Sequence, residues 1–566
     1  MERFSPFPSP FFLLHFPFSF DSSFSVQMKS RPRNVRQPPS SSYSHSPETI
    51  TDINVAEIAR RMGSEHREHI CTSSSHPHSP SYISLLPPEI LAEIFAYCLP
   101  SESFPIPSRS EAPLLLTQVS SHWRALAIAT PDLWTAIHIN YKDPVEDIPA
   151  SDIWLSRSRN KHLSLSIAID FGEQPQQEIL DALCKYSNRW KHVRFDFRHL
   201  LCPPMYSLDI ALGHVPQLCT FEFHARDIST MNVHPITRLL ASAPQLREVS
   251  WVDDLADTET MMELPLGQLS HLSLAMEHGT LDYLQVLNEC LNLEHIRITK
   301  PLFKAIHSQP PLFLSKLTSL NISPDLTGIF DHLTLPALRE VRIHSDLSKH
   351  VQSHPSHLPP SLPHAHTSAP TELWNPAGLC LLIERSACAI TSLSISSPMA
   401  EDALMQCLLR TSRSLVKLSV EGTGVGDILL RSLTRQSGHA KARNTHLDSP
   451  VHAYEGLDVL CPRLEEISFD TCVSSMQDVL SNMVQSRMIF SKHAGRNGEQ
   501  DTVEGWTTIR RVRVADGQQD LERLKELRRL SRLDPSLPFI LEIIPRKQPR
   551  ANTRNYFFRR KLCASR

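Results

Sequence analysis

Apolar side chains recur along most of the chain in the order apolar-x-x-apolar-x-apolar, usually just after a stretch of helical periodicity. The triplets that carry this pattern are Trp190/Val193/Phe195, Leu218/Phe221/Phe223, Leu246/Val249/Trp251, Leu269/Leu272/Leu274, Leu293/Ile296/Ile298, Leu317/Leu320/Ile322, Leu338/Val341/Ile343, Ile390/Leu393/Ile395, Leu415/Leu418/Val420, Leu464/Ile467/Phe469 and Ile509/Val512/Val514. Neighbouring triplets lie about 21–28 residues apart, or about twice that where an insertion intervenes, a period typical of solenoids. Each unit gives a short strand and a crossing helix, which cannot bury their apolar faces alone. The pattern therefore predicts an α/β solenoid over residues 137–545, with the strands in one curved parallel sheet.

Residues between the buried strand positions must point outward. They form a small, polar and mildly basic column: Arg194, Glu222, Ser250, Ser273, Arg297, Asn321, Arg342, Ser394, Ser419, Ser468 and Arg513. One interpretation is a substrate platform in which Arg297, Asn321 and Arg342 engage an extended acidic or phosphorylated peptide. The other is an ordinary solvated strand face. The sequence alone leaves both open.

A different periodicity precedes the repeats, in a helical segment over residues 83–135. Its first apolar stripe begins behind Pro87 and Pro88 and contains Ile90, Leu91, Ile94, Phe95 and Cys98. Leu115, Val119, Trp123, Leu126 and Ala127 make a second stripe at the same spacing, and Pro131 ends that helix. About fifty residues are too few to bury all this apolar surface. The segment must pack on the rest of the chain or on a partner.

The string L-P-x-E-I-L-x-x-I-F, followed by V-x-x-x-W-R-x-L-A and D-L-W, resembles the F-box. It is carried by Leu86, Pro88, Glu89, Ile90, Leu91, Ile94, Phe95, Val119, Trp123, Arg124, Leu126, Ala127, Leu133 and Trp134. The resemblance implies docking on a Skp-type adaptor and, through it, on a cullin. It also implies that Leu86, Pro87, Ile90, Leu91, Ile94 and Phe95 face that adaptor, while Val119 and Trp123 join them or form the box's own core. The linker from Leu99 to Pro113 is longer than the tight turn common in the family.

The repeats themselves resemble leucine-rich repeats of an irregular kind. That pattern expects Asn or Cys three residues past the third apolar position, and only Cys472 fits. An F-box followed by irregular leucine-rich repeats resembles a large class of fungal F-box proteins. The resemblance implies a non-catalytic substrate-recognition subunit of an SCF-type (Skp-cullin-F-box) ubiquitin ligase that binds a protein substrate through its repeats. The alternative is a leucine-rich-repeat scaffold, or an F-box protein that acts outside any ligase.

Composition bears on which partners, cellular compartment and chemistry to expect for this chain. A net charge of -3 gives no drive toward nucleic acid or acidic membranes, and no apolar run is long enough for a transmembrane helix. The 12 cysteines are scattered without a C-x-x-C pair, which favours a reducing compartment, so we expect a cytoplasmic or nuclear protein. No hydrolase, zinc-protease or Walker-type motif is present, and we expect neither an enzyme nor a cofactor. The histidines of residues 348–370 lack regular spacing and accompanying ligands, so no metal site is predicted there.

Four segments differ from the rest by composition. Residues 1–80 are rich in Ser, Pro and His and are predicted to be a disordered leader. Insertions over 348–370 and 435–452 are predicted to be flexible loops within the repeats. The tail over 546–566 is basic; it is either a nuclear address or a weak nucleic-acid patch, or else a frayed solvated end.

Hydrogen exchange tests the disorder predicted for the leader and for the first insertion. We expect backbone amides in residues 1–80 and 350–370 to exchange at nearly the rate of an unfolded chain, because these segments bury too little apolar surface to order the backbone. Strong protection of either segment in an exchange experiment read by mass spectrometry would contradict the prediction.

Overall fold

The computed structural model describes residues 82–101, 103–141, 144–170, 177–198, 207–226, 233–252, 258–275, 282–299, 311–344, 374, 376–422, 424–435, 460–470, 478–493, 507–515, 520–532 and 539–544. These residues belong to one compact unit that begins at Ser81. The predicted leader, the insertion over 348–370, nearly all of the insertion over 435–452 and the basic tail lie outside the described residues.

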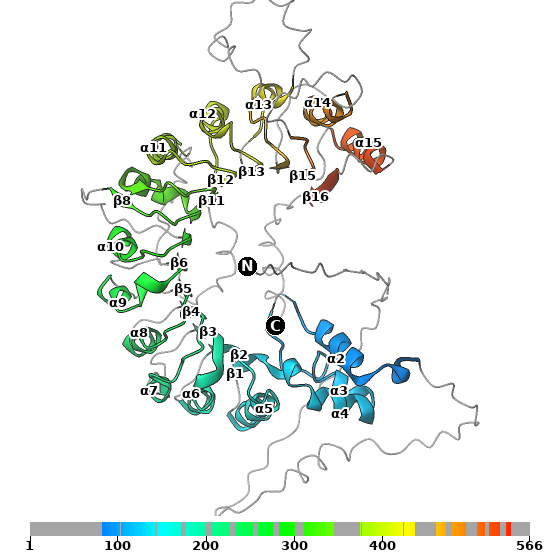
Figure 1. Ribbon diagram of the computed structural model, residues 1–566, viewed down its shortest axis with the longest axis vertical. Helices are drawn as coiled ribbons and strands as arrows, with labels where there is room; N and C mark the ends of the chain where they lie inside the picture. The colour runs from blue at the N-terminus through cyan, green and yellow to red at the C-terminus, as the bar shows by residue number, and fades with distance from the viewer. Residues whose placement is uncertain are drawn as a thin grey trace, which may run out of the picture. The chain divides into compact units, whose positions relative to one another are not determined.

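A parallel sheet of 14 strands runs through the described part of the unit, in chain order and without closing on itself (Figure 1). Its strands are β1 (Ala136–Tyr141), β2 (Leu163–Asp170), β3 (Trp190–Arg198), β4 (Thr220–Arg226), β5 (Glu248–Val252), β6 (His271–Ala275), β7 (His295–Thr299), β9 (Ser319–Ile322), β11 (Glu340–His344), β12 (Ser392–Ser396), β13 (Lys417–Val420), β14 (Glu466–Phe469), β15 (Arg511–Ala515) and β16 (Ile540–Ile544). The strands β8 (Leu312–Phe313) and β10 (Leu333–Thr334) form a separate parallel pair. The predicted α/β repeat fold with a curved parallel sheet is confirmed.

Helices cover the outer face of the sheet (Figure 1). They are α5 (Pro144–Arg157), α6 (Gln177–Cys184), α7 (Leu208–Ala211), α8 (His234–Ala241), α9 (Thr258–Met262), α10 (Tyr283–Asn288), α11 (Ala377–Ser386), α12 (Glu401–Thr411), α13 (Asp427–Leu433), α14 (Val479–His493) and α15 (Leu521–Arg532). Short 3-10 helices η3 (Ser187–Arg189), η5 (Leu266–Gln268) and η6 (Pro324–His332) complete this layer. Helix and strand alternate because parallel neighbours need a crossover connection.

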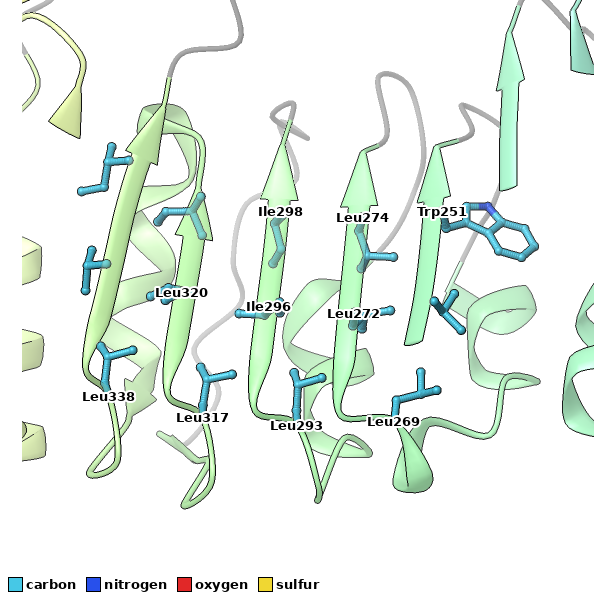
Figure 2. Packing of buried hydrophobic residues seen from close by; sticks show 14 of the residues in the cluster. Trp251, Leu269, Leu272, Leu274, Leu293, Ile296, Ile298, Leu317, Leu320 and Leu338 are labelled. Carbon is cyan, nitrogen blue, oxygen red and sulfur yellow. The ribbon is translucent and has the colours of Figure 1, made fainter. Parts of the chain in front are cut away.

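The core lies between these two layers and is built from the predicted triplets. Every residue of every triplet is at most 3% exposed. Figure 2 shows part of the ladder, in which Leu272, Ile296 and Leu320 occupy equivalent places on adjacent strands. Each apolar side chain therefore packs against its counterparts in the preceding and following repeats.

Three strands of the long sheet, β1, β2 and β16, lie outside the predicted triplets. Trp134, Ile137 and Ile139 do fit the triplet spacing and begin β1, but the triplet starts inside the helical segment. His162 stands where β2 would need its first apolar residue, and Pro538 stands there for β16. β1 and β16 are the two edge strands of the sheet, whereas β2 has a strand on either side.

The helical segment consists of η1 (Tyr82–Leu85), α2 (Pro88–Tyr97), α3 (Leu116–Val119), α4 (Ser121–Ala129) and η2 (Pro131–Trp134). The expectation of one continuous second helix was wrong. Ser120 has extended backbone, and its Oγ accepts a hydrogen bond from the Trp123 N–H at 3.1 Å, so it caps a new helix. Leu115 and Val119 consequently belong to a different helix from Trp123.

Trp134 joins this segment to the first repeat. It is fully buried, and its Nε1 donates to the Ala127 carbonyl at 2.8 Å. Its ring meets Trp154 of α5 edge-on at 4.9 Å between centroids, and the Arg157 guanidinium lies 4.5 Å from its centroid. Both layers of the first repeat thus depend on one side chain from the helical segment.

The long linker between α2 and α3 has a structural role of its own. Pro105 is buried, and its carbonyl accepts a hydrogen bond from the His138 N–H on β1 at 2.8 Å. An uncovered edge strand would offer unpaired backbone groups to other chains. The extra residues of the linker place backbone along that edge.

Arginine side chains fasten successive repeats. Arg487 of α14 is 3% exposed and donates to the carbonyls of Leu433 at 2.7 Å, Leu460 at 2.7 Å and Cys461 at 2.9 Å. Burial lowers the pKa of Arg487 to about 10, so the side chain stays charged at neutral pH. Arg385 of α11 likewise donates to the Leu333 carbonyl of the preceding unit at 3.0 Å. Such contacts satisfy carbonyls at the turns where helices end.

Replacing Arg487 should destabilise the C-terminal repeats. Arg487→Met removes the donors of three buried carbonyls, and each unsatisfied group costs about 1–3 kcal/mol. We expect a lower urea midpoint and faster amide exchange in β13 and β14. Arg463→Met, which changes an exposed arginine nearby, is the matched control. Equal midpoints for the two variants would contradict the proposed role.

Candidate functional site

A shallow groove of about 380 Å³ lies on the exposed face of the sheet, opposite the helices. It crosses the strands from β4 to β11. The residues that line it are Thr220, Glu222, Glu248, Val249, Ser250, His271, Leu272, Ser273, His295, Ile296, Arg297, Ser319, Asn321, Glu340 and Arg342. The three candidate substrate residues Arg297, Asn321 and Arg342 are therefore brought together in one concave surface.

Strand register arranges the polar lining in two columns. The predicted column is confirmed, since Ser273, Arg297, Asn321 and Arg342 are successive partners across β6, β7, β9 and β11. A second column, two residues earlier on each strand, was not used in the sequence analysis. It runs Thr220, Glu248, His271, His295, Ser319 and Glu340. The period of two along each strand contained the signal for it.

Arg342 is already engaged within the chain. Its Nε and Nη2 both donate to Glu340 Oε1, at 2.9 and 2.6 Å. Glu340 also accepts from Ser319 Oγ at 3.0 Å. The guanidinium of Arg342 thus meets a carboxylate of its own strand, which reduces its capacity to hold an acidic ligand.

Two histidines stack in the second column. The rings of His271 on β6 and His295 on β7 lie 4.3 Å apart between centroids and are inclined by 16°. His271 Nδ1 is 2.9 Å from Ser270 Oγ and 3.8 Å from Glu248 Oε1. The pair forms a flat polar platform near the middle of the groove.

The C-terminal strands carry a different surface. Lys417, Glu466, Arg511 and Glu542 form a ladder of ion pairs with separations of 3.2, 3.7 and 3.5 Å. Arg513 of the predicted column pairs with Glu542 at 2.7 Å. The charges in this ladder largely compensate one another, so this end of the sheet offers less to a charged ligand than the groove does.

A second candidate surface lies on α2. Ile90 is 45% exposed, Ile94 is 37% exposed and Tyr97 is 82% exposed. Spaced four and three residues apart, they occupy one face of the helix. Leu91 and Phe95 lie beside that face and are fully buried. The helix is thus apolar over two adjacent stripes, and the described chain covers only one.

The residues assigned to adaptor docking therefore divide into two groups. Pro87, Ile90, Ile94 and Val119 are exposed, and Leu86 is half-buried. Leu91 and Phe95, expected to face a partner, instead face the chain's own interior. Phe95 lies 4.8 Å from Trp123 between ring centroids, so Trp123 takes part in the segment's own core. Helical spacing could not separate the two groups, because Ile90 and Ile94 are four residues apart and so are Leu91 and Phe95.

Other exposed apolar residues of this segment were not predicted as contacts. Leu85 is 67% exposed, just before α2, and Leu115 is 44% exposed, just before α3.

Metal and membrane chemistry find no support in the part of the chain that is described. Among those residues no cluster of three or more His, Cys, Asp or Glu side chains is arranged to hold a metal ion. Within the same ranges, no helix combines the length and apolar character needed to cross a membrane.

Comparison with known proteins adds little. Neither a family model nor a curated protein matches the chain. Among solved structures, a chain in the crystal structure of the Rad7 and Elc1 complex in yeast is similar over 68% of this chain and 89% of its own length, with 11% identity and a TM-score of 0.28.

The division of α2 into a buried and an exposed stripe is testable by stability. Phe95→Ala should cost about 3–5 kcal/mol, because it empties a filled core position. Ile94→Ala, on the exposed stripe, should change stability by less than about 1 kcal/mol. Thermal or urea unfolding followed by amide exchange in α2 and α4 measures both. Similar losses for the two variants would mean that the stripes are not distinct.

Proposed function

We propose that this chain is the substrate-recognition subunit of an SCF-type ubiquitin ligase. Its helical segment binds a Skp-type adaptor and, through it, a cullin. Its repeats bind a protein substrate across the groove. The chain itself is non-catalytic and supplies recognition, whereas the transfer of ubiquitin belongs to other subunits of the assembly.

The observation that carries this proposal is the uncovered apolar stripe of α2. Full burial of an exposed isoleucine side chain contributes about 1.5–3 kcal/mol. Ile90 and Ile94, which are 45% and 37% exposed, have roughly half of that still to gain from a partner. A helix that keeps them exposed beside an intact core is typical of a partner-binding surface. The stripe lies within the string that resembles the F-box, where the family binds its adaptor.

The groove supports the second half of the proposal. It lies on a rigid sheet, and its polar groups are held in fixed register rather than on loops. A surface of that kind suits recognition of a segment from another protein.

A charge on the exposed stripe should abolish adaptor binding. Ile90→Asp and Ile94→Asp each place an unpaired carboxylate in an apolar interface, which costs several kcal/mol. We expect adaptor recovery to fall at least about tenfold, with the circular dichroism spectrum unchanged. Phe95→Asp is unsuitable, because Phe95 is buried and its loss would unfold the segment.

Ile428→Asp provides the matched control. Ile428 is 49% exposed on α13, within the repeats, so it receives the same change of charge at a similar exposure. Affinity purification with quantitative mass spectrometry then measures adaptor and cullin together. Wild-type recovery of the adaptor by both α2 variants would refute the docking surface, and recovery of adaptor without any cullin would favour a role outside a ligase.

A further inference from the structure

The middle of the groove differs in charge from its two ends. The strands β6, β7 and β9 present His271 and Ser273, then His295 and Arg297, then Ser319 and Asn321. None of these outward residues is acidic. The carboxylates that line the groove, Glu222, Glu248 and Glu340, stand on β4, β5 and β11.

Each of these carboxylates has a partner at its own end. Glu222 pairs with Arg194 at 3.6 Å, and Glu340 holds Arg342. Glu248 accepts a hydrogen bond from Thr220 Oγ1 at 3.3 Å. Two of these acids also contact the middle strands, because Glu340 accepts from Ser319 Oγ and Glu248 lies 3.8 Å from His271 Nδ1. The middle strands themselves present only groups that donate hydrogen bonds or can carry positive charge.

The stacked histidines place two imidazole rings in contact in this middle region. Two rings 4.3 Å apart cannot both gain a positive charge without mutual repulsion. An anion placed over them offsets that repulsion. The other charged or titratable groups around the pair are Glu248 on β5, Arg297 on β7 and the Glu340–Arg342 pair on β11, with Glu222 on β4 and His192 on β3 further away. Of these, Glu248 is the acid placed close to His271, and Arg297 shares a strand with His295.

Asn321 adds a second polar feature. Its side chain is half-buried, and its Oδ1 atom is buried without a hydrogen-bond partner among the described residues. A buried acceptor of this kind is costly to leave unsatisfied. Once the Asn321 side chain rotates toward the groove, this oxygen can accept a hydrogen bond from an N–H group of a bound peptide, two strands away from His271.

From this arrangement we infer that β6, β7 and β9 form a proton-linked binding site for a carboxylate-bearing segment of a partner protein. The carboxylate contacts Arg297 and the His271–His295 pair, and the Asn321 Oδ1 accepts from the backbone of the segment. Two strand spacings span about 10 Å, which about three residues of extended peptide cover. The inference rests on the proposed function only in taking the groove as the substrate surface.

The expected signature is an affinity that rises as the pH falls. Imidazole groups gain their proton between about pH 8 and pH 5, whereas glutamate side chains remain largely ionised at pH 6. A ligand that binds the protonated pair preferentially causes the protein to take up protons on binding. The affinity therefore rises as the pH falls through this range. Arg297 keeps its charge throughout and contributes equally at every pH.

Fluorescence anisotropy with the full chain tests the inference, using labelled octaglutamate, octaglutamine and octalysine as probes. We expect octaglutamate to bind about tenfold more tightly at pH 6.0 than at pH 7.5, and octaglutamine and octalysine to bind weakly at both. A His271→Gln/His295→Gln double variant should lose the pH dependence. Arg297→Ala should weaken octaglutamate binding about tenfold at both pH values.

Matched controls lie on the same sheet. His192→Gln changes a histidine of the same column outside the groove lining, and Arg513→Ala changes an arginine paired with Glu542. Both should behave as wild type. Binding that does not distinguish octaglutamate from octaglutamine, or a pH dependence that survives in the double variant, would overturn the inference.

The same variants separate this inference from the proposed function. All groove variants should recover the Skp-type adaptor at wild-type levels, because α2 is unchanged. If the unmodified chain binds the adaptor but does not bind octaglutamate, the inferred carboxylate site is refuted and the proposed function is unaffected. Failure of the unmodified chain to recover adaptor counts against the proposed function, whatever the peptide result.

Discussion

In-register stacking of apolar triplets is the constraint on which the rest of this structure depends. No single strand with its helix can exclude water from both of its faces, so each repeat is stable only against its neighbours. Once Leu272, Ile296 and Leu320 stand side by side, the register of the whole sheet is set. The outward residues must then form columns, and the groove follows from the chemistry of those columns.

Specific polar contacts reinforce this apolar ladder where it is weakest. Long excursions of the chain separate β11 from β12 and β13 from β14, and Arg385 and Arg487 donate to carbonyls of the preceding units next to them. At the N-terminal end, Trp134 connects the helical segment to the first repeat, while backbone of the linker lies along β1. Apolar burial drives the stacking, and these contacts hold the irregular repeats in place.

The sequence was sufficient for the central repeats because each triplet is a local pattern with a fixed spacing. It was insufficient wherever the outcome depended on competition between local alternatives. Ser120 could continue a helix or cap one, and only the surrounding packing selects the cap. Ile90 and Leu91 are equally apolar, yet tertiary contacts bury only Leu91. For the groove, the column of Arg297, Asn321 and Arg342 was predictable from strand periodicity. The pairing of Arg342 with Glu340 was not, since it depends on side-chain rotamers.

The outward columns also divide the recognition surface into equal steps. Each strand advances the surface by one strand spacing of about 4.8 Å, and each column carries one outward residue per strand that is free to vary without disturbing the core. Duplication or loss of an entire repeat moves a contact by one strand spacing and leaves the side chains on either side unchanged. A lineage that carries such a sheet can therefore lengthen, shorten or rewrite its recognition surface in discrete steps, while the register that holds the fold together stays the same.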